Sequence, residues 1–285
     1  MKVALIGADG QLGSEIIREN KSYEIIPLYY PKFDVTKFEE VREYFKSLRP
    51  DAVINTAAFH RVDECEDFPE KSFFVNSISV RNLAMISNEL DFTLVHFSTD
   101  YVFDGEKRSP YIEEDNPNPL NVYGTSKLVG EIFLKNIGRK YFLIRTSGLY
   151  GVSGSIEKGG NFVEFMVKFA KEGRKIRVVR DQVLTPTNAR ELAIKILKLI
   201  NTDLYGVFHM TNEGYCSWYE FAEEIFNLIK MKVYLAPVTS EEYGAKAKRP
   251  KYSVLENKNL KNTDIEGFSH WREALESYLK EKRYI

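Results

Sequence analysis

The sequence predicts an α/β fold in which a parallel sheet carries helices on both faces. Short β-rich runs and amphipathic runs take turns through the first half of the chain, and turn or polar residues bound each β-rich run. This alternation implies right-handed crossovers and a doubly wound sheet. After about residue 150 the rhythm loosens, which predicts a smaller C-terminal lobe.

The first half supplies the strands and helices of this sheet. Runs of four to six β-rich residues indicate buried strands at Lys2–Ile6, Glu24–Tyr29, Ala52–Asn55, Thr93–Ser98 and Tyr141–Arg145. Between them, apolar residues recur at three-to-four spacing, which is typical of amphipathic helices. These helices are expected at Leu12–Asn20, Phe38–Leu48, Phe74–Leu90 and Gly124–Ile137.

The second half begins with a Gly- and Ser-rich stretch, Gly151–Gly160, that indicates a flexible loop. Further helices are expected at Phe162–Ala170, Ala189–Ile200, Trp218–Ile229 and Trp271–Lys280, with a strand at Val207–Met210. We therefore expect residues 1–155 to form the sheet domain and residues 156–285 mainly the lobe. Residues 186–210 are expected to return to the sheet.

Charge, hydropathy and cysteine content exclude several classes of protein. The 40 Lys and Arg nearly cancel the 41 Asp and Glu, so no field that attracts nucleic acid or membrane is expected. About 18 apolar residues in a row, enough for a membrane span, occur nowhere. Cys65 and Cys216 lie far apart and lack metal-site spacing, which predicts neither a disulfide framework nor a metal. A cytoplasmic location is expected.

A glycine-rich turn, Gly7-Ala8-Asp9-Gly10-Gln11-Leu12-Gly13, lies between the first predicted strand and helix. Such glycines let the backbone approach a pyrophosphate, which the helix N-terminus binds, so the turn predicts a Rossmann-type dinucleotide site. No acid for the ribose 2′-hydroxyl ends the second strand. Lys32 nearby favours NADPH over NADH, although it fits a solvated lysine equally well. Asp34 fits either a cofactor contact or a cap.

Tyr123 and Lys127 form a YxxxK pair, which a helix places on one face. The ammonium is expected to lower the phenol pKa, so that the tyrosine exchanges a proton with a substrate oxygen. Thr99 follows a predicted strand, at the sheet edge where ligands bind, and is expected to donate to a substrate carbonyl. An exposed helical pair, and a turn cap at Ser98 or Asp100, stay open as structural alternatives.

Segments along nearly the whole chain together resemble the extended short-chain dehydrogenase/reductase family. They are GADGQLG (7–13), VINTAA (53–58), FSTDYVFDG (97–105), PLNVYGTSKLVGE (119–131), RTSGLYG (145–151), GGNF (159–162), DQVLTPT (181–187) and RPKYSVL (249–255). The resemblance implies that Thr99, Tyr123 and Lys127 form a catalytic triad. It also implies hydride transfer from NAD(P)H to the 4-keto group of a dTDP-4-keto-6-deoxy sugar, with no metal.

The same resemblance implies the binding residues. For the cofactor they are Gly7, Gly10, Gln11, Leu12, Asp34, Val35, Ala57, Ala58 and Asn76, with Tyr123 and Lys127. For the substrate we expect His60, Val62, Thr99, Asp100, Phe162 and Arg249. The chain departs from the related bacterial reductases at two places: Gly148 replaces a usual tryptophan, and Phe59-His60-Arg61 replaces a smaller segment. Both departures leave the sugar open.

Two alternatives stay open. The pattern is also similar to the NADP-binding regulatory beta subunit of methionine adenosyltransferase, although an intact Thr99/Tyr123/Lys127 set favours an enzyme. Among enzymes, a nucleotide-sugar epimerase or another reductase remains, whereas a dehydratase is disfavoured because Tyr101, rather than a second acid, follows Asp100. A nucleotide sugar is the expected partner, and the sequence leaves a homodimer open.

Overall fold

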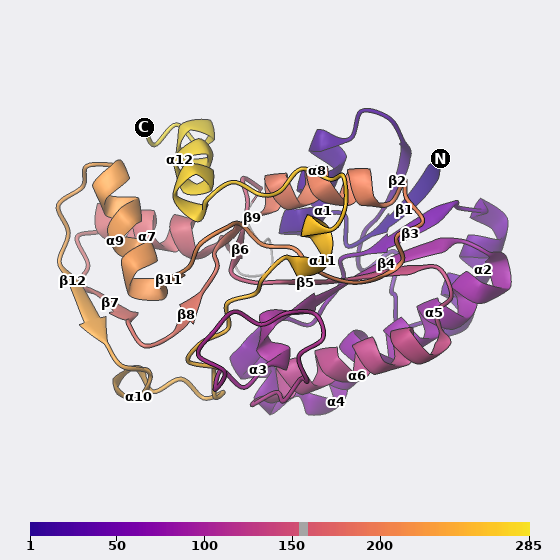
Figure 1. Ribbon diagram of the computed structural model, residues 1–285, viewed down its shortest axis with the longest axis horizontal. Coiled ribbons are helices and arrows are strands. Elements are labelled where there is room, and N and C mark those ends of the chain that lie inside the picture. The colour runs from indigo at the N-terminus through magenta and orange to yellow at the C-terminus, as the bar shows by residue number, and fades with distance from the viewer. Residues whose placement is uncertain (154–158) are drawn as a thin grey trace.

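The computed structural model describes residues 1–153 and 159–285. Figure 1 shows a sheet sandwiched by helices, with a smaller lobe built from later parts of the chain beside it. The expected flexible loop at Gly151–Gly160 falls largely on residues 154–158, outside the described residues. The expected domain boundary at residue 155 falls there too, so the division into two domains stays a prediction.

The central sheet is parallel throughout, in the order β10-β5-β4-β3-β1-β2. Its strands are β1 (Lys2–Ile6), β2 (Glu24–Leu28), β3 (Ala52–Asn55), β4 (Thr93–Thr99), β5 (Tyr141–Thr146) and β10 (Gly206–His209). The chain runs from β1 to β2 on one side and then returns to β3 on the other. The carboxyl ends of β1 and β3 therefore flank the crevice where such sheets bind ligands.

Side chains of β1 alternate between the two faces of this sheet. Val3 and Leu5 pack into one buried apolar cluster, with helices α1 (Gln11–Glu19) and α8 (Ala189–Leu199) over it. Ala4 and Ile6 pack into the other. That face is covered by α2 (Phe38–Leu48), α5 (Ser79–Leu90) and α6 (Val122–Ile137). Burial on both faces explains why the strands have nearly continuous hydrophobic runs.

The sequence prediction was wrong about β2, which was expected to be buried. It is the edge strand of the sheet, and Glu24 and Pro27 are exposed on it. An edge strand tolerates a proline because one side of its backbone has no ladder partner. The other five strands of the sheet, including β10 at the opposite edge, lie within one or two residues of the predicted ranges.

The prediction of a single helix at Phe74–Leu90 is also wrong, both about where the helix starts and about its being regular throughout. Helical structure begins earlier, with α4 (Pro69–Phe73), passes through a π-helical turn, η1 (Phe74–Ile78), and continues as α5. Such π-turns often mark functional sites because one extra residue bulges from the helix. A short helix, α3 (Val62–Asp67), precedes α4 and was not predicted.

The smaller lobe has its own apolar core, in which Phe221, Trp271 and Tyr278 are buried. Helices α7 (Phe162–Lys171), α9 (Trp218–Leu228) and α12 (Trp271–Glu281) surround it, close to their predicted ranges. The sequence did not predict the short elements outside the central sheet. They are the strand pairs β7/β12 (Ile176–Val179, Leu235–Val238), β8/β11 (Val183–Leu184, Cys216–Ser217) and β6/β9 (Leu149–Tyr150, Thr187–Asn188), helix α10 (Ser240–Tyr243), and helix α11 (Lys258–Lys261), which packs against β10. Strands of two to four residues are too short for a periodic signal.

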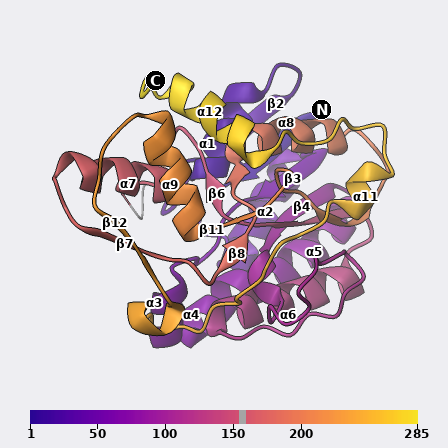
Figure 2. The same ribbon diagram turned by 60° about the vertical axis from the view of Figure 1, so that its left-hand side comes forward.

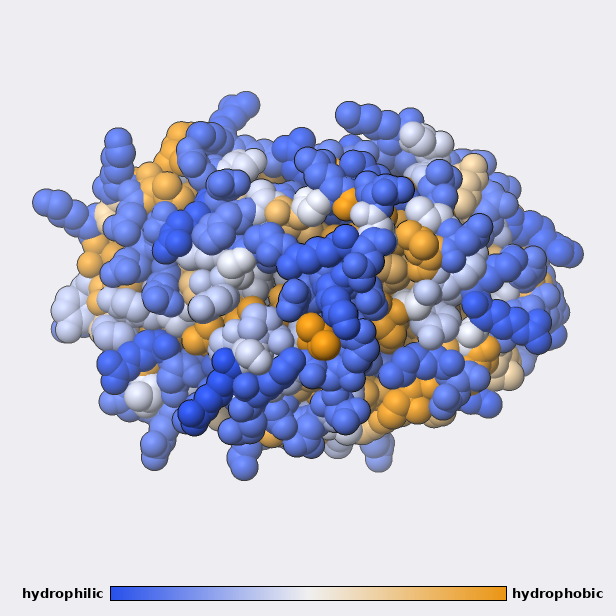
Figure 3. Space-filling model, in the orientation of Figure 1, coloured by the Kyte–Doolittle hydropathy of each residue, from blue (hydrophilic) through white to orange (hydrophobic). Residues whose placement is uncertain are grey.

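The face in Figure 3 is mostly hydrophilic, with apolar side chains scattered over it. Across residues 1–153 and 159–285, no helix combines the length and the apolar character needed to cross a bilayer.

Candidate active site

The glycine-rich turn lies where the sequence predicts it, between β1 and α1. Gly7 has a φ of 74°, and a Cβ there would lie 2.8 Å from Thr56 Oγ1. A Cβ on Gly13 would lie 2.8 Å from Ala8 Cα, so the helix packs tightly against the turn. Thr56 donates to Ile6 O at 2.7 Å and fastens the end of β3 to this turn. Only glycine fits these close approaches.

The first turn of α1 fits a dinucleotide pyrophosphate. Gly10 is its N-cap and supplies no side-chain cap, so the first N–H groups of the helix have no intrahelical acceptor. Gln11 donates from Nε2 to Leu149 O at 2.8 Å, while its buried Oε1 has no partner among the described residues. Leu12 is only 6% exposed and packs into the sheet core, so its side chain serves packing and its backbone faces the turn.

Around this turn, the other expected cofactor residues differ in their surroundings. Ala57 and Ala58 are half-buried directly after β3, beside the turn. Val35 is buried in the sheet core. Asp34 Oδ1 accepts from Thr36 N at 3.0 Å and from Thr36 Oγ1 at 2.7 Å, which is the turn-capping role that the sequence left open.

Asn76 is fully buried in the π-turn, and its amide groups are satisfied within the protein. Oδ1 accepts from Phe59 N at 3.0 Å, and Nδ2 donates to Phe59 O at 2.9 Å and Ser126 Oγ at 3.0 Å. Asn76 therefore joins the segment after β3 to α6. Its expected contact with the cofactor stays a prediction.

Helix α6 begins two residues before the predicted start, because Asn121 caps it by accepting from Gly124 N at 2.7 Å. Gly124 is required for close packing, since a Cβ there would lie 3.0 Å from the carbonyl carbon of Tyr101. Tyr123 is thereby pressed against the turn that follows β4, where Tyr101 meets it edge-on with ring centroids 6.1 Å apart.

Thr99 ends β4 and occupies the centre of this site. Its hydroxyl donates to Asp100 Oδ1 at 3.1 Å and lies close enough to the Tyr123 phenol to lower the pKa of that phenol. Its oxygen also accepts from Tyr101 N at 3.2 Å and so caps the short helix η2 (Asp100–Val102). The cap that the sequence analysis allowed for Ser98 or Asp100 is therefore provided by Thr99.

The expected effect of Lys127 on the Tyr123 pKa is not seen. Burial raises the pKa of Tyr123 above its ordinary value, and the nearby Thr99 hydroxyl opposes this rise. Lys127 is 2% exposed, and its Nζ lies 3.5 Å from His96 Nε2. Burial lowers the pKa of Lys127 to about 8, while Glu131 raises it. The pair lies on α6, but the buried lysine faces β4.

Asp100 is only 3% exposed and is held by hydroxyl groups from two other segments. Oδ2 accepts from Ser147 Oγ at 2.8 Å and from Ser253 Oγ at 2.5 Å. Burial raises the pKa of Asp100 to about 6, and the three hydroxyl bonds lower it. These contacts orient Thr99. The expected contact between Asp100 and the substrate stays a prediction.

The remaining substrate candidates lie on different segments. Arg249 is 18% exposed and forms two hydrogen bonds with Asp63 of α3, at 3.1 Å and 2.9 Å. Its charge also lowers the pKa of Tyr101, which packs edge-on against Tyr123. His60 is half-buried, with Nδ1 donating to Ala58 O at 3.2 Å, and Val62 opens α3. Phe162 packs against Trp218 with ring centroids 4.6 Å apart, in the core of the smaller lobe.

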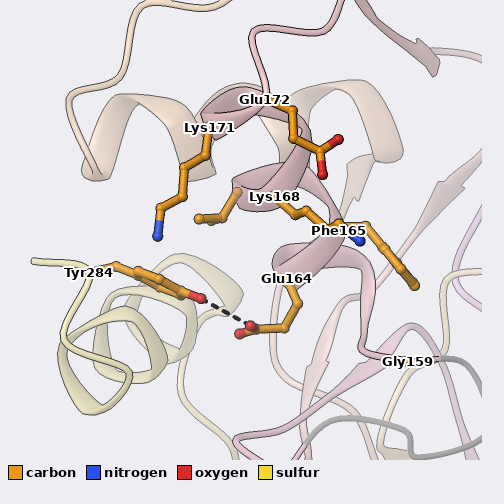
Figure 4. A pocket seen from close by; sticks show the side chains of 8 residues that line it. Gly159, Glu164, Phe165, Lys168, Lys171, Glu172 and Tyr284 are labelled. Atoms are coloured by element: carbon orange, nitrogen blue, oxygen red, sulfur yellow. Dashed lines mark hydrogen bonds between the residues drawn. The ribbon is translucent and has the colours of Figure 1, made fainter.

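A separate pocket of about 340 Å³ lies on the smaller lobe, away from the triad. Figure 4 shows Lys171 reaching toward the ring of Tyr284, whose hydroxyl donates to Glu164 at 2.9 Å. Within residues 1–153 and 159–285, no three His, Cys, Asp or Glu side chains gather closely enough to hold a metal ion.

Sequence reasoning missed several residues that build this site. Ser147 and Ser253 stand in the RTSG and RPKYS segments, which gave no sign that both bond Asp100. Asp63 was missed because it is 186 residues from its partner Arg249. His96 was missed because it reads as one more residue of a buried strand. Each role depends on contacts between distant segments.

The parallel sheet and the glycine turn after β1 are those of an extended short-chain dehydrogenase/reductase. A protein-family model described as the RmlD substrate binding domain matches residues 1–284. The chain belongs to this family.

Known relatives match along nearly their whole length. The chain is 41% identical to the spore coat polysaccharide biosynthesis protein SpsK of Bacillus subtilis, over 99% of this chain and 98% of the relative. It is 34% identical to dTDP-4-dehydrorhamnose reductase of Burkholderia thailandensis, over 96% and 97%. The crystal structure of dTDP-4-dehydrorhamnose reductase from Bacillus anthracis in complex with NADP superposes with a TM-score of 0.94, at 41% identity, over 98% and 99%.

Proposed function

We propose that this protein reduces the 4-keto group of a dTDP-4-keto-6-deoxy sugar with NAD(P)H, as a dTDP-4-dehydrorhamnose reductase. The observation that carries the proposal is the packing of Tyr123 against the turn at the carboxyl end of β4, where its ring meets Tyr101 edge-on beside Thr99. Ligands of open α/β sheets bind beyond these strand ends. A phenol and a hydroxyl that converge there can share the negative charge that develops on a carbonyl oxygen.

The relatives support the same activity. Those from Burkholderia thailandensis and Bacillus anthracis carry the name dTDP-4-dehydrorhamnose reductase, and the latter structure contains NADP. Similarity over nearly the full length supports transfer of the reaction class. We keep two expectations within the proposal: NADPH is preferred over NADH, and the working form is a cytoplasmic homodimer. Exposed Lys32 supports the first, because a cation there can pair with a 2′-phosphate.

Each residue of the site has its own role in the proposed reaction. NAD(P)H, when bound, supplies the hydride. The first turn of α1 binds its pyrophosphate through backbone N–H groups, and Gly7 and Gly13 let the backbone approach. Tyr123 donates a proton to the carbonyl oxygen. The Thr99 hydroxyl, which bonds Asp100 in the structure, can turn its single proton to the same oxygen when a substrate is bound. Asp100 holds the Thr99 hydroxyl in place. Lys127, one helical turn from Tyr123 and buried against β4, is the source of the proton that restores the phenol after the reaction.

The test is cofactor absorbance at 340 nm, the nicotinamide band, with a dTDP-4-keto-6-deoxy sugar as substrate. The proposal expects one NAD(P)H oxidised for each sugar reduced. An epimerase would convert the sugar without net oxidation. A regulatory subunit would capture methionine adenosyltransferase in stoichiometric amounts and leave the cofactor unoxidised. Running NADPH and NADH side by side tests the cofactor preference, and sedimentation tests the homodimer.

A further inference from the structure

His96 and Lys127 meet in the interior, between β4 and α6. Lys127 Nζ lies 3.5 Å from His96 Nε2, and the two residues are 2% and 1% exposed. On the other side of the ring, His96 Nδ1 lies 3.3 Å from Asn55 Nδ2 at the end of β3. The proposed function uses Lys127, but it gives no role to His96 or Asn55.

The hydrogen bonds of Asn55 determine which nitrogen of His96 carries the proton. Asn55 Oδ1 accepts from Ala57 N at 3.2 Å, so the amide oxygen points away from the ring and Nδ2 points toward it. An amide NH₂ group only donates, so Nδ1 of His96 is the acceptor and carries no hydrogen. Burial and the neighbouring Lys127 hold the pKa of His96 well below its usual range. The neutral ring therefore carries its proton on Nε2.

This tautomer directs an N–H group at Lys127 Nζ. An ammonium group has only donors, so it cannot accept from Nε2–H, whereas a neutral amine has a lone pair that can. The ring therefore favours the amine form of Lys127 over the ammonium form.

Charged groups from the surrounding elements are already paired or turned outward. Glu131 of α6 is held by Arg145 of β5 at 2.6 Å, and Glu66 of α3 accepts from Val122 N at the start of α6. Glu70 and Lys71 of α4 are exposed. The π-turn η1 contributes neutral Asn76 and Ser77 to this side of α6, and α5 carries Arg81, which donates to Asn82. His96 is thus the titratable side chain that meets the Lys127 amine directly.

We propose that His96 is a positioning residue that stabilises the unprotonated amine of Lys127. This inference rests on the proposed function, which determines the step of the reaction at which Lys127 becomes an amine. When Tyr123 gives its proton to the substrate oxygen, the Lys127 ammonium gives up the proton that restores the phenol and becomes an amine. The amine lone pair then accepts from His96 Nε2–H. A proton from water restores the ammonium, so the protein returns to its starting state with one proton consumed for each hydride transferred.

The tautomer is tested directly by long-range ¹H–¹⁵N NMR on the full chain with ¹⁵N-labelled histidine, between pH 6 and 8. His96 is expected to be neutral with its proton on Nε2. His209 is an internal reference with the opposite tautomer, its proton on Nδ1. Its Nδ1 donates to Tyr111 O at 3.0 Å, and its Nε2 faces Arg145 Nη1 at 3.3 Å. His96→Gln and His209→Gln identify the two signals by their loss. A His96 signal with the proton on Nδ1, or with a positive charge, overturns the inference whether or not the protein is a reductase.

The effect on Lys127 is tested by the pH dependence of kcat. In His96→Gln the side-chain oxygen can accept a hydrogen bond from the Lys127 ammonium and so stabilise it. The limb of the kcat–pH profile that follows the deprotonation of Lys127 is therefore expected to move to higher pH by about one unit. His209→Gln is the matched control, a buried histidine of the same sheet, and is expected to leave this limb in place. A merely structural role for His96 would lower kcat at every pH and leave the limb unmoved, which would contradict the proposal.

Discussion

Thr99 donates its hydroxyl to Asp100 Oδ1 at 3.1 Å, while the same hydroxyl oxygen accepts from Tyr101 N. The side chain is thus fixed by its own neighbours in the sequence, at the end of a buried strand. Asp100 is fixed in turn by Ser147 and Ser253, which come from segments far along the chain. The Thr99 hydroxyl therefore has one orientation before any ligand binds, with its proton donated to Asp100.

Asp100 is expected to set an acid limb in the pH profile. Its pKa is raised to about 6, so the carboxylate that holds Thr99 becomes protonated as the pH falls through 6. We expect kcat to fall with a midpoint near pH 6, and Asp100→Asn to lower kcat about tenfold and remove the limb. Asp104→Asn is the control, because hydrogen bonds hold the pKa of Asp104 below its ordinary value. An unchanged acid limb in Asp100→Asn would contradict the assignment.

Lys127 is expected to reduce the stability of the protein at neutral pH. Its folded-state pKa of about 8 lies below the usual lysine value of 10.5, so the unfolded chain binds this proton more tightly. Between these two values the wild-type free energy of unfolding rises with pH. Lys127→Met should therefore be more stable than the wild type at pH 7, by up to about 3 kcal/mol, with the difference shrinking above pH 8.

Urea unfolding at pH 7, 8 and 9 measures this difference. Lys135→Met, on the exposed face of the same helix, is the control and should change little at any of these pH values. If Lys127→Met is less stable than the wild type at pH 7, burial of the Lys127 ammonium does not destabilise the protein as we infer.

Gly148 is expected to resist substitution, because its backbone conformation and its neighbours leave no room for a side chain. Its φ is 53°, and a Cβ would lie 2.8 Å from Leu184 Cδ1 and 3.1 Å from Pro186 Cα. We expect Gly148→Ala to lower the free energy of unfolding by about 2 kcal/mol or more. Gly173 also has a positive φ but open space around it, so Gly173→Ala should cost only about 1 kcal/mol. Equal losses in thermal or urea unfolding would show that the contacts with Leu184 and Pro186 do not matter.

Asp63 and Arg249 are expected to be energetically coupled, because this pair joins α3 to the segment that also supplies Ser253. The carboxylate accepts two hydrogen bonds from the guanidinium, which lies largely out of solvent. A double-mutant cycle of Asp63→Ala and Arg249→Ala should give a coupling of about 1 kcal/mol in urea unfolding. Strict additivity would mean that the pair contributes nothing to holding Arg249 beside Tyr101.

The sequence predicted the large sheet well because its strands are buried on both faces and separated by strongly periodic helices. β1, β3 and α2 have the predicted bounds. It failed where the signal is local or short. The π-turn at Phe74–Ile78 keeps the helical spacing on both sides, so no pattern marks its extra residue. The edge position of β2 depends on strand order, which hydropathy alone does not contain.

In the candidate site, too, some features follow from the sequence and others do not. The glycine turn, Tyr123 and Lys127 could be predicted because each lies in a short motif whose spacing has a physical reason. The surroundings of Lys127 could not, since they depend on which side chain of β4 faces α6. The sequence analysis expected the ammonium to act on Tyr123, whereas the structure places it 3.5 Å from His96. Burial, which a motif does not report, then determines the direction of both pKa shifts.

The most direct test of the central claim compares Tyr123→Phe with the wild type in NADPH oxidation driven by a dTDP-4-keto-6-deoxy sugar. The variant loses the phenolic proton but keeps the ring packed against Tyr101. We expect kcat to fall about a hundredfold or more, the scale of losing a positioned acid, with NADPH affinity nearly unchanged. Equal turnover in Tyr123→Phe, or no sugar-dependent oxidation by the wild type, would contradict the account.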